Sequence, residues 1–171
     1  MKKNLVLTGM MGVGKTTIGK KLADKLKAKF VDIDRMIELQ EKSTIRSIFE
    51  NKGEEYFRRI EKKISLTELK KNNLVIALGG GAFINLSIRK EVKSSCVSFW
   101  LDLDPKFLIR RLKNVKKRPL LDPKNLGQSI NKIYSERKKI YSESDFRIKC
   151  SSMEKYEIIE KIKKLYEDTN N

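Results

Sequence analysis

Short apolar runs alternate with segments of helical periodicity along the chain. Residues 4–8, 74–78 and 97–101 are almost continuously apolar, which is typical of strands buried on both faces of a parallel sheet. Residues 30–34 and 146–150 mix apolar and polar positions within a similar length. We therefore predict five strands, and we expect the alternating segment at 146–150 to lie at an edge of the sheet.

Helical spacing fills the intervals between these strands. Ile18, Leu22 and Leu26 recur at four-residue steps directly after the first strand and its glycine loop, as on one face of a helix. Strands that alternate with helices predict a three-layer α/β/α fold with a five-stranded parallel sheet, in a single domain over residues 1–171. The further helices that we expect span residues 36–41, 44–51, 53–71, 86–93, 106–113, 125–142 and 154–167.

Charge and composition restrict the partners of such a domain. The 171 residues include 39 Lys and Arg against 22 Asp and Glu, a formal net charge of +17, and no His. Such a surface attracts anions, which include nucleotides, acidic metabolites and nucleic acid. The excess is mostly Lys spread along the whole chain, so we favour a generally basic surface over a specific nucleic-acid footprint. Without His, proton transfer must use a carboxylate, Lys, Tyr or water.

The cysteines and the hydropathy favour a cytoplasmic protein. Cys96 and Cys150 are far apart and have no metal-ligand spacing, so we interpret them as reduced core residues. The apolar run after Met1-Lys2-Lys3 is too short for a signal peptide, and Gly9 and Lys15 interrupt it. No segment approaches the length that spans a bilayer, so we expect no membrane partner.

The most informative motif is the sequence GMMGVGKT at residues 9–16, which fits G-x-x-x-x-G-K-[ST]. In this loop, glycines let the backbone surround a phosphate, while Lys15 can reach the β- and γ-phosphates of a nucleotide and the Thr16 hydroxyl can bind Mg²⁺. The helix that follows directs its positive end at the same anion. A glycine turn with an incidental Lys is the alternative, but a strand before the loop and a helix after it favour a phosphate site.

Candidate metal and substrate ligands follow two strands. Asp32 and Asp34 are two residues apart, so in an extended strand they would share a face at its carboxyl end, where ligands bind in open α/β sheets. Asp34 can alternatively cap the next helix at residues 36–40, and the two roles are compatible. Because the strand at 74–78 ends in three glycines rather than in an Asp, Asp32 is the first candidate for the carboxylate that supports Mg²⁺. Asp102 is a weaker one.

Two arginines are also candidates for anion binding. Arg137 falls within the apolar stripe of the helix expected at 125–142, where a guanidinium needs an anionic partner. The pattern leaves open whether that partner is an internal carboxylate or the carboxylate of a substrate. Arg58 and Glu61 can pair on their helix, and their spacing alone favours a solvated surface pair. The basic, proline-containing segment 114–123 is typical either of a lid that closes over a nucleotide or of a plain surface loop.

In this order, the motifs resemble those of the shikimate kinase family, over residues 4 to about 165. The phosphate loop alone would indicate only a superfamily, but the ordered set is specific. It also contains Asp32-Ile33-Asp34, Gly53-Glu54 with Phe57-Arg58 and Glu61, Gly79-Gly80-Gly81, Arg118-Pro119-Leu120-Leu121, and Arg137 before Tyr141. The resemblance implies a P-loop kinase fold with a core at 1–32, 62–111 and 125–171, a small helical substrate-binding region at 33–61 and a lid loop at 112–124.

The resemblance also implies an activity and the residues that perform it. The family transfers the γ-phosphoryl group of ATP to the 3-hydroxyl of shikimate, on the route to chorismate and the aromatic amino acids, as a cytoplasmic monomer that uses Mg²⁺. The implied catalytic residues are Lys15, Asp34 and Arg118, and the implied metal ligands are Thr16 and Asp32. The implied nucleotide contacts are Gly12, Val13, Gly14, Lys15, Thr16, Thr17, Arg111, Arg118 and Met153. The implied substrate contacts are Asp34, Arg58, Gly79, Gly80, Gly81 and Arg137.

Two other functions remain open at this point. Another small-molecule kinase of the same shape, such as a gluconate kinase or a nucleoside monophosphate kinase, would share the phosphate loop. Asp34, Arg58 and Arg137 favour a hydroxylated carboxylic acid, but gluconate has that chemistry too, so it is the family motifs that favour shikimate. A basic nucleic-acid-binding ATPase is the alternative from another class, and it predicts strong salt-dependent binding to DNA or RNA.

Overall fold

The computed structural model describes residues 3–112, 119–122 and 124–170. Five parallel strands form one sheet in the order β2-β3-β1-β4-β5. The strands are β1 (Asn4–Thr8), β2 (Lys29–Asp32), β3 (Leu74–Ala77), β4 (Cys96–Asp102) and β5 (Phe146–Lys149). The three central strands are buried along their whole length, whereas β5 lies at an edge and alternates in burial. The predicted parallel sheet and the edge position of its last strand are confirmed.

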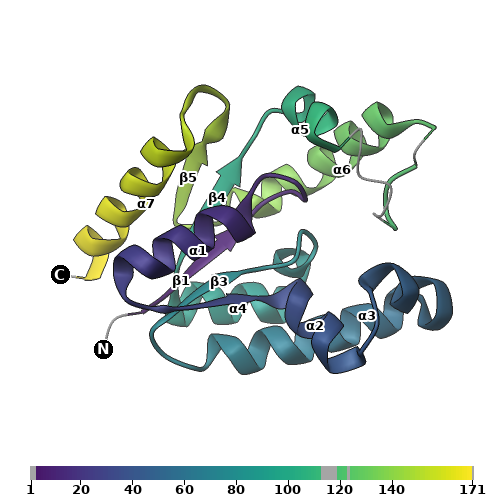
Figure 1. Cartoon of the computed structure of the whole chain (residues 1–171), viewed down its shortest axis with the longest axis horizontal. Helices are drawn as coiled ribbons and strands as arrows, with labels where there is room; N and C mark the ends of the chain where they lie inside the picture. The colour runs from purple at the N-terminus through teal and green to yellow at the C-terminus, as the bar shows by residue number, and fades with distance from the viewer. Residues whose placement is uncertain (1–2, 113–118, 123, 171) are drawn as a thin grey trace.

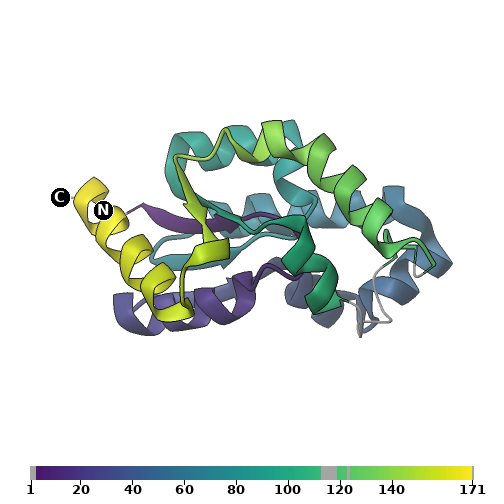
Figure 2. The same cartoon turned by 90° about the horizontal axis from the view of Figure 1, so that it is seen from above.

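Helices cover both faces of this sheet. Figures 1 and 2 show α1 (Lys15–Leu26) and α7 (Lys155–Asn170) on one face, with α3 (Ile45–Leu69), α4 (Leu86–Ser95) and α6 (Leu126–Tyr141) on the other. The predicted three-layer architecture is therefore confirmed. The shorter helices α2 (Ile33–Glu41) and α5 (Pro105–Leu112) and the 3₁₀ turns Ala82–Ile84 and Cys150–Ser152 lie in the connections.

One continuous apolar core lies on both sides of the sheet. Leu5, Leu7, Ile76 and Phe99 from the central strands are fully buried, and each contributes roughly 1.5–3 kcal/mol of transfer free energy. The two cysteines are buried free thiols, as predicted. Within the described part of the chain, no helix is both long enough and apolar enough to cross a membrane.

The transition from β2 to α2 differs from the prediction. The strand ends at Asp32, whose carboxylate accepts a hydrogen bond from the backbone N–H of Arg35 at 3.3 Å. Asp32 is therefore the N-cap, and Asp34 lies in the first helical turn. Two expectations are wrong: that residues 30–34 are extended throughout, and that Asp34 caps a helix at 36–40. The cap at Asp32 supplies the first acceptor for the helix, so the helix begins earlier.

The helices expected at 44–51 and 53–71 form one element, α3, with an interruption at Gly53. Gly53 has φ 81° and ψ 168°, a conformation that glycine adopts without a steric cost. The rings of Phe49 and Phe57 pack across this kink with their centroids 4.7 Å apart. The predicted boundary between the two helices thus coincides with the interruption at Gly53, but both segments belong to one element.

Candidate active site

The phosphate-binding sequence forms a tight loop between β1 and α1. Gly9, Gly12 and Gly14 have φ values of 130°, 77° and 106°, in the region that favours glycine. Because Gly14 immediately precedes α1, the loop ends at the positive end of the helix dipole. A cavity of about 220 Å³, here called the loop cavity, is lined by Gly12, Gly14, Lys15, Thr16 and Thr17 together with Asp32 and Asp34.

Lys15 is held inside this loop. Its side chain is only 9% exposed, and Nζ donates hydrogen bonds to the carbonyl oxygens of Gly9 at 2.8 Å and Met10 at 2.9 Å. These contacts hold an ammonium group at the wall of the loop cavity. A phosphate oxygen in the cavity offers the same group a charged acceptor, which forms stronger hydrogen bonds than a carbonyl does.

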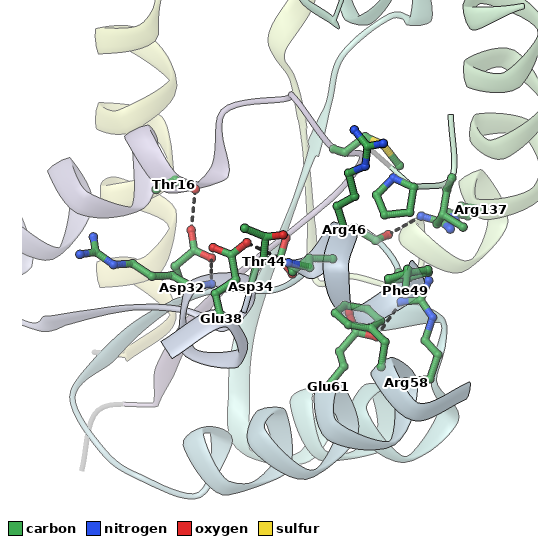
Figure 3. Close-up of a pocket in the computed structure, with 18 residues that line it drawn as sticks. Thr16, Asp32, Asp34, Glu38, Thr44, Arg46, Phe49, Arg58, Glu61 and Arg137 are labelled. Atoms are coloured by element: carbon green, nitrogen blue, oxygen red, sulfur yellow. Dashed lines mark hydrogen bonds and ion pairs between the residues drawn. The ribbon is translucent and has the colours of Figure 1, made fainter. Parts of the chain in front are cut away.

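Thr16 and Asp32, the two residues predicted to bind Mg²⁺, contact each other. The Thr16 hydroxyl donates to Asp32 Oδ2 at 2.6 Å (Figure 3). A hydroxyl and a carboxylate are the hard oxygen donors that Mg²⁺ prefers, and this ion usually retains waters and takes other ligands from phosphates. Among residues 3–112, 119–122 and 124–170, no group of three or more His, Cys, Asp or Glu is placed to hold a metal ion alone. The pair therefore fits Mg²⁺ that arrives with a nucleotide.

A second cavity of about 600 Å³, here called the outer cavity, continues from the loop along α1. Gly12, Gly14 and Thr17 line both cavities, and Val13, Phe107, Arg111 and Met153 line the outer one. Arg111 Nη1 donates to the carbonyl oxygen of Val13 at 3.1 Å, so its guanidinium lies next to the phosphate loop. The structure thus brings together the predicted nucleotide contacts that it describes.

A third cavity, of about 670 Å³, is the largest of these three. It is here called the side-chain cavity, because polar and aromatic side chains from separate elements line it (Figure 3). Asp34 and Glu38 come from α2, Phe49, Phe57, Arg58 and Glu61 come from α3, and Arg137 comes from α6. Thr16, Asp32, Asp34 and Gly80 also line the loop cavity. A ligand in the side-chain cavity would therefore adjoin the phosphate site.

Half-buried Arg58 forms an ion pair with buried Glu61. Arg58 Nη1 lies 2.7 Å from Glu61 Oε2, and Arg58 Nη2 lies 3.1 Å from Glu54 Oε1. Glu61 is only 2% exposed, and burial raises its pKa above the usual value although Arg58 and Arg137 favour the carboxylate; Asp34 adds a further increase. The prediction from spacing, that Arg58 and Glu61 form a solvated surface pair, is therefore wrong. The neighbouring Phe57 and Ile60, both buried, were the signal that this helix face points inward.

The three glycines after β3 let charged side chains approach the backbone closely. A Cβ atom at Gly79 would lie 2.6 Å from both Asp34 Oδ1 and Glu61 Oε1, and one at Gly81 would lie 2.5 Å from Arg58 Nη1. Side chains at these positions would displace the carboxylates and the guanidinium. Gly80 and Gly81 line the side-chain cavity, while Gly79 lies close to Asp34 and Glu61, which line it.

Arg137 is oriented by the same glycine segment. Its Nη1 donates to the Gly80 carbonyl oxygen at 2.9 Å, and the Tyr141 hydroxyl donates to that same oxygen. Burial raises the pKa of Tyr141, so the phenol remains a donor. Two partners were considered for Arg137, an internal carboxylate and a substrate carboxylate. Within the described part of the chain, Arg137 forms no ion pair with a carboxylate, and its hydrogen bond goes to a carbonyl oxygen. The guanidinium, which carries five N–H donors, lines the cavity.

Several predicted positions have other outcomes. Arg118 lies outside the described residues, so its assignment remains a prediction; Pro119 and Leu120 beside it line the side-chain cavity. The weaker metal candidate Asp102 is paired with Arg147 at 2.6 Å and accepts a hydrogen bond from Tyr134 at 2.9 Å. Burial, together with this bond to Asp102, raises the pKa of Tyr134 to about 12.

Comparison with known proteins shows the family of this chain. The family model described as shikimate kinase matches residues 11–167. A shikimate kinase of Sulfurihydrogenibium sp. is 41% identical over 160 residues, which cover 94% of this chain and 95% of that protein. The chain belongs to the shikimate kinase family. It is an ATP-dependent kinase, as the phosphate loop predicted.

Solved structures agree with this assignment. Shikimate kinase from Acinetobacter baumannii, determined in complex with shikimate, is 32% identical and superposes with a TM-score of 0.93 over 98% of this chain and 94% of that one. A gluconokinase from Sinorhizobium meliloti superposes with a TM-score of 0.63 at 14% identity, which shows a shared fold alone. The comparison thus supports the predicted P-loop kinase fold and separates this chain from the gluconate kinase alternative at the level of family.

Proposed function

We propose that the enzyme transfers the γ-phosphoryl group of ATP to the 3-hydroxyl of shikimate, with the residues of the three adjoining cavities in the roles set out below. The observation that carries this proposal is the convergence of two cations, Arg58 and Arg137, and of the carboxylate of Asp34 on a cavity that adjoins the phosphate loop. A hydroxylated carboxylic acid offers complementary groups to all three, and the family membership selects shikimate among such acids.

The nucleotide would occupy the outer and loop cavities. Its base would lie against Arg111 and Met153, and its phosphates would receive hydrogen bonds from the backbone of residues 12–17. Lys15 would exchange its two carbonyl acceptors for phosphate oxygens. The ammonium would then neutralise charge that develops on the transferring group, which is the main catalytic demand of phosphoryl transfer. Arg118, predicted on the lid, would add a second positive charge.

Mg²⁺ would be held by Thr16 directly and by Asp32 through water. When bound, it would neutralise phosphate charge. The existing hydrogen bond between the two side chains keeps both oxygens at one wall of the loop cavity. Asp32 is also the N-cap of α2, so the same carboxylate would link the metal site to the helix that carries Asp34.

The carboxylate of shikimate would lie between Arg58 and Arg137. Each guanidinium is already oriented, Arg58 by Glu54 and Glu61 and Arg137 by the Gly80 carbonyl. Orientation before binding reduces the rotamer entropy lost on binding. Asp34 would accept hydrogen bonds from the ring hydroxyls, and Gly79, Gly80 and Gly81 would leave room for this close packing.

The reaction follows from this geometry. The 3-hydroxyl oxygen forms a bond to the γ-phosphorus as the bond from that phosphorus to the β,γ-bridging oxygen breaks, and ADP leaves. The hydroxyl proton passes to the Asp34 carboxylate, which the described structure holds at the junction of the loop and side-chain cavities. The sequence contains no His to compete for this role.

The proposal also covers the domain organisation, the oligomeric state and the cellular location of the enzyme. We assign the core to residues 1–32, 62–111 and 125–171, the substrate-binding region to 33–61 and the lid to 112–124. We expect a monomer, as the family resemblance implies, and a cytoplasmic location, because the buried Cys96 and Cys150 are free thiols. Sedimentation velocity at micromolar concentration tests the monomer.

The experiment that tests the function measures ADP release from Mg·ATP with shikimate, gluconate, AMP or no acceptor. We expect turnover with shikimate alone, and a new phosphomonoester on its 3-hydroxyl by ³¹P NMR. Turnover with another acceptor would reject the substrate assignment. No specific nucleic-acid partner is expected; tight binding to DNA or RNA that survives physiological salt and greatly exceeds general attraction to a +17 surface would contradict that.

A further inference from the structure

The carboxylate of Glu41 connects α2 with the two halves of α3, before and after Gly53. Oε2 of Glu41, the last residue of α2, lies 2.8 Å from Lys52 Nζ and accepts a hydrogen bond from the Tyr56 hydroxyl at 2.9 Å. Lys52 Nζ also donates to the Tyr56 hydroxyl at 3.2 Å, so the three groups form a closed triangle. Lys52 lies over the Tyr56 ring, 4.6 Å from its centroid, which adds a cation–π contact.

The triangle spans the interruption of α3. Lys52 is the last residue before Gly53, and Tyr56 lies in the first turn after it. Gly53 itself has open space around it, since a Cβ there would meet no atom within 4 Å, so packing at this residue does not set the angle between the two halves of α3. Side chains on either side of the kink therefore contribute to this angle, namely the Phe49–Phe57 ring contact and the triangle.

The segments that meet at the triangle are those that line the side-chain cavity. Asp34 and Glu38 belong to α2, Phe49 belongs to the first half of α3, and Arg58 and Glu61 belong to its second half. The other end of the α2–α3 connection is held separately, because Glu38 Oε1 accepts a hydrogen bond from the Ile45 N–H at 3.0 Å. None of Glu41, Lys52 and Tyr56 is among the residues described as lining the cavity.

The environment of Glu41 differs from that of an ordinary surface ion pair. Its side chain is 10% exposed, whereas that of Lys52 is 47% exposed. The hydrogen bond from Lys52, followed by that from Tyr56, lowers the pKa of Glu41 below its usual value. A fully exposed pair contributes little because solvent screens it; here one shielded oxygen receives two donors from opposite sides of a kink.

We propose that Glu41, Lys52 and Tyr56 form a clasp that, together with the Phe49–Phe57 contact, sets the bend of α3 at Gly53 and thereby positions Arg58 relative to Asp34. Glu41 and Tyr56 are positioning residues for the carboxylic-acid substrate, and they touch neither substrate. The inference rests on the proposed function, because it assumes that shikimate occupies the side-chain cavity. Without the clasp, the angle between the two halves of α3 varies. Shikimate binding must then also order the walls of the side-chain cavity, and this cost lowers the affinity for shikimate.

The test compares Glu41→Gln, Tyr56→Phe and the double variant with wild type by steady-state kinetics and by calorimetric titration of shikimate. We expect each single change to raise the shikimate KM and Kd about five- to tenfold, with kcat and the ATP KM within about twofold. The double variant should be no worse than the poorer single variant, because both changes open one triangle. Lys52→Arg, which keeps a cation for the carboxylate, should be closer to wild type than Lys52→Met.

Glu55→Gln is the matched control. Glu55 is exposed on the same helix, next to Tyr56 and outside the triangle, and its replacement removes the same charge. We expect wild-type kinetics from it. Unchanged shikimate affinity in Glu41→Gln and Tyr56→Phe would overturn the clasp, and so would equal losses for shikimate and ATP, which would indicate general destabilisation. The same series includes turnover of the wild-type enzyme with shikimate. Absence of that turnover would contradict the proposed function, whereas the variants test only the clasp.

Discussion

The phosphate loop and the side-chain cavity adjoin each other but are built in different ways. The loop consists of consecutive residues whose glycines adopt positive φ, and the groups that we propose to bind phosphate are mainly its backbone N–H groups. The side-chain cavity takes charged groups from α2, α3 and α6, and ion pairs and carbonyl contacts orient them. A contiguous backbone site needs one local conformation, whereas the cavity needs the correct relative placement of three helices.

This difference implies different sensitivities to mutation. Removing a side chain from the loop leaves its backbone cradle in place. In the cavity each functional group also holds its neighbours, as Glu61 does for Arg58 and as the Gly80 carbonyl does for Arg137. We therefore expect loop variants to affect the handling of phosphate and cavity variants to affect the acceptor substrate, in the following order of size.

The largest effect is expected where the two regions meet, at Asp34. Asp34→Asn removes the proposed proton acceptor but keeps the size of the side chain beside Gly79. General-base removal lowers kcat by about 10²–10⁴-fold. We expect a loss at the upper end of this range, with ATP binding unchanged in a calorimetric titration. A near-normal kcat would assign Asp34 to substrate positioning alone.

The second effect concerns the loop. Lys15→Met removes the ammonium group and retains most of the aliphatic stem. The loss of one preorganised cation at the transferring phosphate should lower kcat by about 10²–10³-fold, with the shikimate Kd within twofold of wild type when measured without nucleotide. Stopped-flow or quenched-flow kinetics measure kcat, and calorimetric titration measures the shikimate Kd. A weakened shikimate Kd would show that the two regions are not separable.

The third effect concerns the acceptor. Arg137→Ala should weaken shikimate binding by about 2–3 kcal/mol, roughly 30- to 150-fold in KM, because a desolvated carboxylate loses one of its two cations. The ATP KM should change little. Arg137→Lys serves as the control for charge without the bidentate guanidinium and should recover part of the affinity. An unchanged shikimate KM in Arg137→Ala would remove this residue from the substrate site.

The smallest effect is a pH dependence at Glu61. Burial raises the pKa of this carboxyl in the folded protein, so the folded state holds its proton more tightly than the unfolded state does. Its contribution to stability is therefore present at low pH and is lost as pH rises from the unfolded value through the raised folded value. Glu61→Gln has no such group. The difference in unfolding free energy between variant and wild type, from urea titrations at several pH values, should shift toward the variant as pH rises through this window. Shikimate affinity should be lower in Glu61→Gln than in wild type, because the variant lacks the carboxylate that orients Arg58.

The sequence by itself determined the parts of this enzyme that depend on local order. The apolar runs predicted the five parallel strands, and the spacing within residues 9–16 predicted the phosphate loop, because both follow from nearest neighbours along the chain. The ordered motifs were sufficient to indicate the family. The boundary between helices at 44–51 and 53–71 was also predicted, and the interruption of α3 lies there, at Gly53.

Only the tertiary structure decided which side chains face one another. Spacing could not reveal that Glu61 is buried against Arg58, that Tyr141 and Arg137 share the Gly80 carbonyl, or that Asp32 rather than Asp34 caps α2. Nor could it reveal that Glu41 meets Lys52 and Tyr56 across the kink. Most of these arrangements depend on contacts between separate elements, and their formation depends on how the helices pack on the sheet. Helical and strand periodicity specify which face of an element is buried, but the partner of that face is selected by packing of the whole chain.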